Sequence, residues 1–375
     1  MELKTDFEDF LAAIRPTENQ KRNLKTGHST LRSRLKADET VKKVHVSDFL
    51  QGSYRRATAV RPNDGRRADV DIVLVTKLSE DDFTPAQAMD LFKPFLDKYY
   101  EGKWRLQGRS FGIELEYVEL DLVLTSAPSE AEQGILESDA VTSDEDLEEA
   151  RDWRLNAAWT DVSKRQLFES RAQVTQASNT PEWAAKPLRI PDRDADQWED
   201  THPLEQIRWT RDKNARTNRC FINVVKSLKW WRLENHPEPK HPKGFPLERL
   251  IGECCPDAID SVAAGLTLTL EKIKSQYKTE ANSGGKPNLK DYGVPNHDVF
   301  KRISAEDFKK FYDQVVAGAD LARKALDSTD RTESGNLWRE LLGDKFPKPP
   351  SGGGSKNAGY TPPTGPATPG SGRFA

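Results

Sequence analysis

The feature that most constrains this chain is an apolar run that begins with two acidic residues. Residues 69–75 read Asp-Val-Asp-Ile-Val-Leu-Val, and a run of β-branched and aliphatic residues of this length predicts a buried strand. Strands are poor in aspartate, so two aspartates at the start of this one indicate a site. Because residues two apart leave a strand on the same face, Asp69 and Asp71 must lie close together.

A third aspartate lies in a second predicted strand region. Residues 111–125 alternate between apolar and polar side chains, which predicts a hairpin or a pair of strands. Leu120, Leu122 and Leu124 then face one way, and Asp121 faces the other. On adjacent central strands the three carboxylates would repel one another in a partly buried cleft, so a cation must offset their charge.

The chemistry of Asp69, Asp71 and Asp121 indicates that this cation is a divalent metal. Hard carboxylate oxygens at this spacing suit Mg²⁺, with Mn²⁺ as the alternative. Two such ions about 4 Å apart can activate an attacking hydroxyl and stabilise a leaving phosphate. The sequence therefore predicts a catalytic site built on two metal ions.

A glycine-serine pair lies upstream of these aspartates, with Ser53 sixteen residues before Asp69. We expect Gly52 and Ser53 to end a strand and to open a short helix over residues 54–59. Glycine lets a phosphate approach the backbone, while a helix N-terminus and a serine hydroxyl offer hydrogen-bond donors. The pair predicts a triphosphate-binding turn beside the metal site. The same segment carries local positive charge on Arg55, Arg56, Arg61, Arg66 and Arg67.

The composition excludes several classes of protein. With 57 basic and 60 acidic residues among 375, the net charge of -3 cannot hold the chain on nucleic acid, so no stable nucleic-acid complex is expected. No apolar run approaches the ~18 residues of a membrane span, and acidic residues stand where a signal peptide has its apolar core. Three cysteines cannot form a disulfide framework. We therefore expect a cytoplasmic protein without membrane contact.

Periodicity predicts an α+β unit followed by a helical unit and a tail. Two helices are expected within residues 1–35, the second starting at a capping box of Thr17 and Gln20. Further helices are predicted within residues 83–100, 202–235, 246–280 and 304–327, and polar loops at 129–150 and 192–200. The units are predicted to span residues 1–200, 201–346 and 347–375, with the active-site cleft between the first two.

The last of these segments has the composition of a disordered tail. Residues 347–375 contain seven prolines and seven glycines, and such a segment cannot bury enough apolar surface to fold.

The order Gly-Ser, Asp-x-Asp, Asp resembles the polymerase-β-type nucleotidyltransferases. The flanking residues resemble the bacterial cGAS/DncV-like nucleotidyltransferases of anti-phage defence. The resemblance runs along the whole chain and is greatest to the members of clade D. It implies a mixed sheet flanked by helices, with a helical C-terminal domain. The matching segments are Gln51-Gly52-Ser53-Tyr54-Arg55-Arg56-Ala57-Thr58, residues 69–75, Tyr117-Val118-Glu119-Leu120-Asp121-Leu122, His202-Pro203-Leu204, Ile207-Arg208-Trp209-Thr210, Lys226 with Lys229-Trp230-Trp231-Arg232, and Gly343 with Phe346-Pro347.

The resemblance implies roles for individual residues. The three aspartates would be the catalytic residues that hold two Mg²⁺ ions. Gly52 and Ser53 would bind the donor triphosphate, with Gln51 at the edge of the nucleotide. The family also places a basic residue of a later helix, expected here from Asn214 to Leu233, on the triphosphate. Lys226 is the preferred candidate for this contact, Lys229 is the alternative, and Asn223 shares the helix face with Lys226.

The implied reaction is repeated nucleotidyl transfer that ends in ring closure. A ribose hydroxyl of one nucleotide attacks the α-phosphate of another, and pyrophosphate leaves. The resemblance implies an adenine-rich cyclic trinucleotide, made from ATP alone or from ATP and a second nucleotide such as GTP. This second messenger would act on a downstream effector.

Two other functions stay open at this point. One is a transferase that adds a nucleotide to an antibiotic, a protein or an RNA end. The other is a nucleotide-sensing adaptor without catalysis, against which the three intact aspartates argue.

The end of the chain adds a further expectation. Some members of the family carry such tails in defence operons, where a ubiquitin-transfer-like ligase joins the terminal carboxylate to a target. The resemblance makes Ala375 a candidate conjugation residue. A merely solubilising extension is the alternative.

Overall fold

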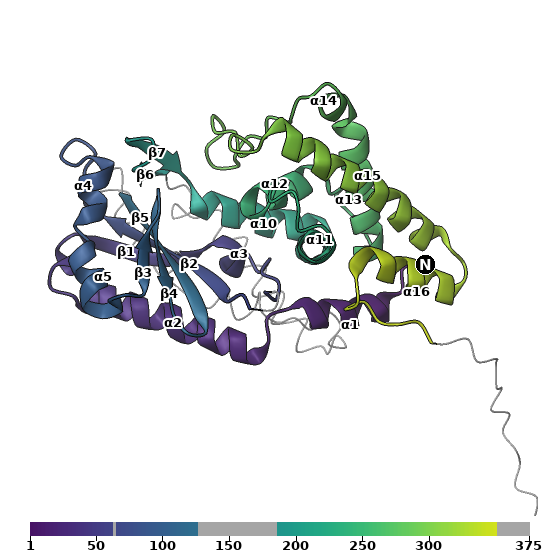
Figure 1. Cartoon of the computed structure of the whole chain (residues 1–375), viewed down its shortest axis with the longest axis horizontal. Coiled ribbons are helices and arrows are strands. Elements are labelled where there is room, and N and C mark those ends of the chain that lie inside the picture. The colour runs from purple at the N-terminus through teal and green to yellow at the C-terminus, as the bar shows by residue number, and fades with distance from the viewer. Residues whose placement is uncertain (63–64, 127–185, 351–375) are drawn as a thin grey trace, which may run out of the picture.

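A mixed sheet forms the centre of the first half of the molecule (Figure 1). The computed structural model describes residues 1–62, 65–126 and 186–350. In the sheet order β1-β2-β5-β4-β3, only β2 and β5 run parallel, and β6 and β7 continue the sheet from the far end of β5. The strands are β1 (His45–Gln51), β2 (Ala68–Thr76), β3 (Trp104–Leu106), β4 (Ser110–Glu114), β5 (Val118–Ser126), β6 (Leu188–Asp192) and β7 (Gln197–Thr201).

One face of this sheet is covered by helices α2 (Glu18–Ala37), α4 (Pro85–Asp90) and α5 (Lys93–Tyr100) (Figure 1). The predicted capping box starts α2: Thr17 and Gln20 exchange side-chain and backbone hydrogen bonds. Leucines of α2 and aromatic residues of α5 pack against alternate residues of β2 and β5 to form the first core. This packing leaves the aspartate-bearing positions of the two strands on the opposite face.

Beyond the two aspartates of β2, the opposite face of the sheet is apolar. Further along β2, Val73 and Val75 contact Leu204 and Ile207 of helix α10 (Pro203–Arg216). The second half of the molecule therefore packs against the same sheet face that carries the acidic residues, but further along the strands.

A second core lies in the helical half. Helix α1 (Lys4–Ile14) belongs to this core, where Phe7 contacts Trp338 and Phe346, and not to the sheet half (Figure 1). The predicted limits of the units at residues 200 and 346 remain a prediction. The remaining helices here are α11 (Phe221–Asn235), α12 (Gly244–Cys254), α13 (Val262–Gln276), α14 (Lys278–Asn282), α15 (Ala305–Asp327) and α16 (Arg331–Leu342).

Several predicted element boundaries were wrong. The single helix predicted over residues 83–100 is two helices, because Pro94 in the first turn of α5 cannot donate a hydrogen bond to the turn before it. The helix expected from Asn214 begins at Phe221, after two residues, Asn218 and Arg219, with positive φ. The acidic stretch 192–200, expected as a loop, is mostly the hairpin of β6 and β7.

The short helix after the glycine-serine pair also differs from its prediction. Helix α3 (Gly52–Arg55) is a single turn that begins two residues earlier than expected and ends before Ala57, whose φ is 58°. A 3₁₀ turn at Val41–Lys43 is a further short helical segment among the described residues. Among the described residues, no helix has both the length and the apolar content needed to cross a membrane.

Candidate active site

The parallel pairing of β2 with β5 brings the acidic residues together. Asp71 is the register partner of Asp121, and Asp69 is the partner of Glu119. Because neighbours in register share a face of the sheet, all four carboxylates lie on the face away from the first core. The three aspartates were predicted to share a face from their sequence pattern, whereas Glu119, two residues before Asp121, was not predicted to belong to the site.

Crowding and burial disfavour the charged forms of these carboxyls. Burial, followed by repulsion from Asp69 and Asp121, raises the pKa of Asp71 to about 7. Burial, followed by repulsion from Glu119 and Asp69, raises the pKa of Asp121 to about 6. A cation held between such groups would relieve this cost.

The donor set fits a hard divalent ion, but the cage is not preassembled. Carboxylate oxygens are the ligands that Mg²⁺ and Mn²⁺ prefer. Within the described ranges, no three His, Cys, Asp or Glu side chains converge closely enough to form a ready group of ligands. Asp121 instead accepts a hydrogen bond from the Gln107 side chain at 3.0 Å. Side-chain rotation within this acidic face would bring the three aspartates onto a common ion.

Gly52 brings the predicted phosphate-binding turn directly against Asp71. Its φ is +72°, and a Cβ atom at this position would lie only 1.7 Å from Asp71 Oδ2. The preceding residue, Gln51, is the register partner of Asp71 across β1 and β2. The turn closes on the Ser53 carbonyl, which accepts a hydrogen bond from the Thr58 backbone N–H at 2.9 Å.

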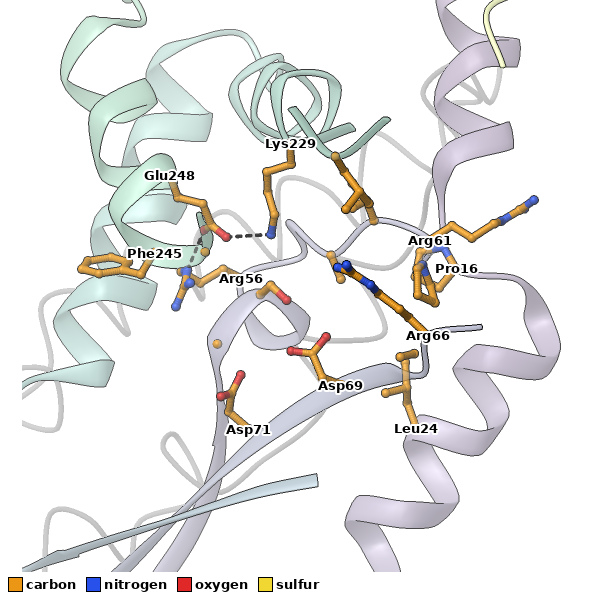
Figure 2. Close-up of a pocket in the computed structure, with 18 of the residues that line it drawn as sticks. Pro16, Leu24, Arg56, Arg61, Arg66, Asp69, Asp71, Lys229, Phe245 and Glu248 are labelled. Atoms are coloured by element: carbon orange, nitrogen blue, oxygen red, sulfur yellow. Dashed lines mark hydrogen bonds and ion pairs between the residues drawn. The ribbon is translucent and has the colours of Figure 1, made fainter. Parts of the chain in front are cut away.

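A cavity of about 450 Å³ opens over this turn, a volume in the range of small-molecule sites. Its wall comes from both halves of the molecule, and Figure 2 shows Asp69 and Asp71 on one side with Lys229 and Glu248 on the other. The lining from the sheet half includes Gln51, Gly52, Ser53, Arg56, Arg61, Arg66, Arg67, Asp69 and Asp71; that from the helical half includes Gln206, Lys229, Phe245 and Glu248.

Four arginines and a lysine make this wall strongly basic, so the predicted local positive charge lies at the cavity. Arg56, Arg61, Arg66 and Arg67 line it, whereas Arg55 is buried and is not among the lining residues. A wall with cations opposite carboxylates suits a ligand that carries both phosphates and divalent metal.

The predicted triphosphate-binding residues of α11 separate in the structure. Lys229 lines the cavity, whereas Asn223 and Lys226, at other positions of the same helix, are buried and do not line it. Burial, followed by the charges of Arg15 and Lys229, lowers the pKa of Lys226 well below its ordinary value. Asn223 accepts a hydrogen bond from Arg15 at 3.4 Å. This geometry favours Lys229 for contact with a ligand.

Some expectations lie outside the described residues. These are the acidic loop at residues 129–150, most of the tail, and Ala375 with its proposed conjugation.

With this geometry established, comparisons with known proteins identify close relatives. Residues 1–126 match the family described as "Second Messenger Oligonucleotide or Dinucleotide Synthetase domain". The chain is 50% identical, over 100% of both proteins, to a cyclic AMP-AMP-GMP synthase of Enterobacter hormaechei subsp. hoffmannii. It is 30% identical to a cyclic AMP-AMP-AMP synthase of Acinetobacter sp., over 93% of this chain and 86% of that protein.

A solved structure shares the fold. The Bradyrhizobium diazoefficiens CD-NTase CdnG, in complex with GTP, superimposes with a TM-score of 0.64 at 11% sequence identity, covering 91% of this chain and 96% of that one.

Proposed function

The chain belongs to the family of second-messenger oligonucleotide synthetases, which are nucleotidyltransferases, and we propose that it makes a cyclic trinucleotide that contains two or three adenine nucleotides. ATP is one substrate of this reaction, and GTP is the candidate for the second. The two relatives support this choice, since one is a cyclic AMP-AMP-GMP synthase and the other is a cyclic AMP-AMP-AMP synthase. The 50% identity to the former favours a product with one guanine nucleotide.

The observation that carries this proposal is the pairing of Asp71 with Asp121, with Asp69 on the same face, beside the turn at Gly52. In our proposal, Asp69, Asp71 and Asp121 hold two Mg²⁺ ions, with Mn²⁺ as a substitute. Bound there, the ions would supply charge neutralisation at the α-phosphate and a lowered pKa for the attacking hydroxyl.

The side chains around the metal-binding face would hold the donor nucleotide. The backbone at Gly52 and Ser53 can approach the triphosphate closely because Gly52 has no side chain. Arg56 and Lys229 face this turn from the cavity wall and would bind the phosphate oxygens (Figure 2). A ribose hydroxyl then attacks the α-phosphorus, the bond to the β-phosphate oxygen breaks, and pyrophosphate leaves.

The test is the product formed from all four ribonucleoside triphosphates with Mg²⁺, identified by mass spectrometry. We expect a phosphatase-resistant cyclic trinucleotide that forms without any added acceptor. Label that appears only on an added antibiotic, protein or RNA would support the transferase alternative instead.

A double variant separates catalysis from an adaptor role. Asp69→Asn with Asp71→Asn should abolish the product, because neutral amides cannot hold the metal charge. Full biological activity in this variant would favour the nucleotide-sensing adaptor.

The partners follow from this proposal. The cyclic product would bind a downstream effector in anti-phage defence. A ubiquitin-transfer-like ligase acting on Ala375 is the proposed partner of the tail, and mass spectrometry of the chain recovered from cells tests whether the terminal carboxylate is joined to another molecule.

A further inference from the structure

A nearly buried carboxylate forms part of the cavity wall, beside two of its basic residues. Glu248 is the fifth residue of α12, and it is 6% exposed. Its Oε2 accepts a hydrogen bond from Arg56 Nε at 3.0 Å, and its Oε1 accepts one from Lys229 Nζ at 3.0 Å. Figure 2 shows both contacts, with Glu248 between the two cations. One carboxylate therefore fixes two basic residues that line the cavity.

The same carboxylate is also connected to the phosphate-binding turn. The Thr58 hydroxyl donates to Glu248 Oε1 at 2.9 Å, and the Thr58 backbone N–H donates to the Ser53 carbonyl at 2.9 Å. Glu248 thus receives hydrogen bonds from three residues. Two of them, Arg56 and Thr58, belong to the segment after the turn, and the third belongs to the helical half.

This arrangement leaves the reactive parts of the site accessible. Arg56 uses Nε for Glu248, so its terminal amino groups are not consumed by that hydrogen bond. Among the described residues, neither Asp69 nor Asp71 forms an ion pair with a cation of the wall, although Arg56 and Lys229 are near enough to oppose the rise in the pKa of Asp71. Without a competing carboxylate, these two cations would be drawn to the aspartates.

We propose that Glu248 is a positioning residue of the nucleotide site: it holds Arg56, Lys229 and the turn at Ser53 in the arrangement that receives a triphosphate. This inference rests on the proposed function for the identity of the ligand. Although Glu248 lines the cavity, both of its carboxylate oxygens accept hydrogen bonds from Arg56, Lys229 and Thr58, so it acts through the two cations. The cost of burying its charge is offset by the two cations and the hydroxyl that bind it.

The test compares Glu248→Gln with the wild-type protein. Glutamine has the same shape but no charge, so it cannot hold both cations. We expect the Kd for a non-hydrolysable ATP analogue with Mg²⁺, measured by calorimetry, to rise about ten-fold or more. The Kd for adenosine should change less than about two-fold, because adenosine has no phosphates for the cations to bind.

Asp48→Asn is the matched control. Asp48 is also a buried carboxylate, held by Arg32, Lys36 and His45, but it lies on β1 and does not line the cavity. This variant should lose stability without changing the Kd for the ATP analogue. Glu248→Asp keeps the charge on a shorter side chain, and it should restore part of the affinity that Glu248→Gln loses.

The outcomes are separable. A Glu248→Gln protein that melts at a lower temperature but binds the ATP analogue as the wild type does would overturn the inference. Equal losses for the analogue and for adenosine would also overturn it. If Glu248→Gln does not fold, the same two comparisons are made with Glu248→Asp. A wild-type protein that binds the analogue but makes no cyclic product refutes the proposed function, while the Glu248 test still stands on binding alone.

Discussion

Gly52 is the residue with the least freedom to change, because its backbone and its neighbour both exclude a side chain. The positive φ disfavours any L-residue, and the carboxylate of Asp71 occupies the space where a Cβ would lie. Both restrictions exist because the turn must approach the acidic face closely. A single missing carbon thus sets the distance between the turn and the metal-binding positions.

Replacing Gly52 by alanine should damage the site more than the fold. We expect Gly52→Ala to reduce the rate of product formation at least about 100-fold, since displacement by about 1 Å can cost that much. The loss of stability should be about 1–3 kcal/mol. Gly102→Ala is the control, because Gly102 also has a positive φ (+68°) but nothing within 4 Å of its Cβ position. Equal rates in the two variants would contradict the predicted role of Gly52.

The raised pKa of Asp71 predicts how pH changes stability when metal is absent. Its folded-state pKa is about 7 and its ordinary value is 3.8. The folded protein therefore favours the protonated form, and it loses stability as pH rises from about 4 to about 7. In EDTA at pH 8, Asp71→Asn should melt at a higher temperature than the wild type, and its free energy of unfolding should be higher by on the order of 4 kcal/mol. The difference should shrink at pH 4.

Mg²⁺ provides the control for this prediction. Added Mg²⁺ should raise the melting temperature of the wild type at pH 8 more than that of Asp71→Asn, because the ion offsets repulsion that the amide lacks. A melting temperature that stays equal in the two proteins at every pH would show that Asp71 carries no such cost.

At this scale, the sequence predicted residues that stand out against their surroundings. The three aspartates interrupt apolar strands, so their pattern alone indicates a site. Glu248 could not be found in this way, because charged residues are ordinary in helices and its partners Arg56 and Lys229 are distant in sequence. Only the rotation of α11 about its axis decides which of Lys226 and Lys229 reaches the cavity. This rotation depends on the packing of Trp230 and Trp231 in the second core.

Helices and strands were predicted best where the sequence pattern that defines them lies within the element itself. The alternation of residues 111–125 led to β4 and β5, and the capping box led to the start of α2. The hairpin of β6 and β7 was missed because its outward residues are acidic, and its strands are held by contacts from elsewhere. Arg189 of β6 pairs with Glu80, and Trp198 of β7 donates to the carbonyl of Phe83, both of which lie outside the hairpin.

The capping box of α2 should stabilise the folded protein. Thr17 follows Pro16, which lines the cavity, at the point where the chain passes from the helical half to the sheet half. Thr17→Ala removes one side-chain acceptor from the helix N-terminus and should lower the free energy of unfolding by about 1 kcal/mol. Thr17→Ser should stay near the wild type. Chemical denaturation measures both, and an unchanged midpoint in Thr17→Ala would contradict the role of the cap.

In the described part of the chain, the sheet core and the helical core meet around the cavity at Gly52, and the predicted fold class, a mixed sheet with a helical C-terminal region, is confirmed. The sequence could not predict that α1 packs in the helical core and not against the sheet. The apolar spacing of α1 shows that one face is buried, but it does not show against which partner. The contacts of Phe7 with Trp338 and Phe346 join residues more than 300 positions apart, which no local pattern encodes.

Because Glu248 connects these two halves, its ionisation should control how they unfold together. Arg56 and Lys229 lower its pKa to about 2 from an ordinary 4.5, against the opposing effect of burial. Its charge therefore stabilises the folded protein above about pH 4.5, and this contribution is lost as pH falls from 4.5 toward 2. Calorimetry should show the two halves melting together at pH 7 and separately near pH 2, where Glu248 becomes protonated in the folded protein.

Glu248→Gln distinguishes this linkage from general acid denaturation. The variant lacks the charge at every pH, so its halves should already melt separately at pH 7, and its melting temperatures should fall less between pH 5 and pH 3 than those of the wild type. Asp48→Asn removes a buried charge from within the sheet half alone, and it should lower one transition without separating the two. Joint melting of Glu248→Gln at pH 7 would show that other contacts, such as those of α10 with β2, suffice to couple the halves.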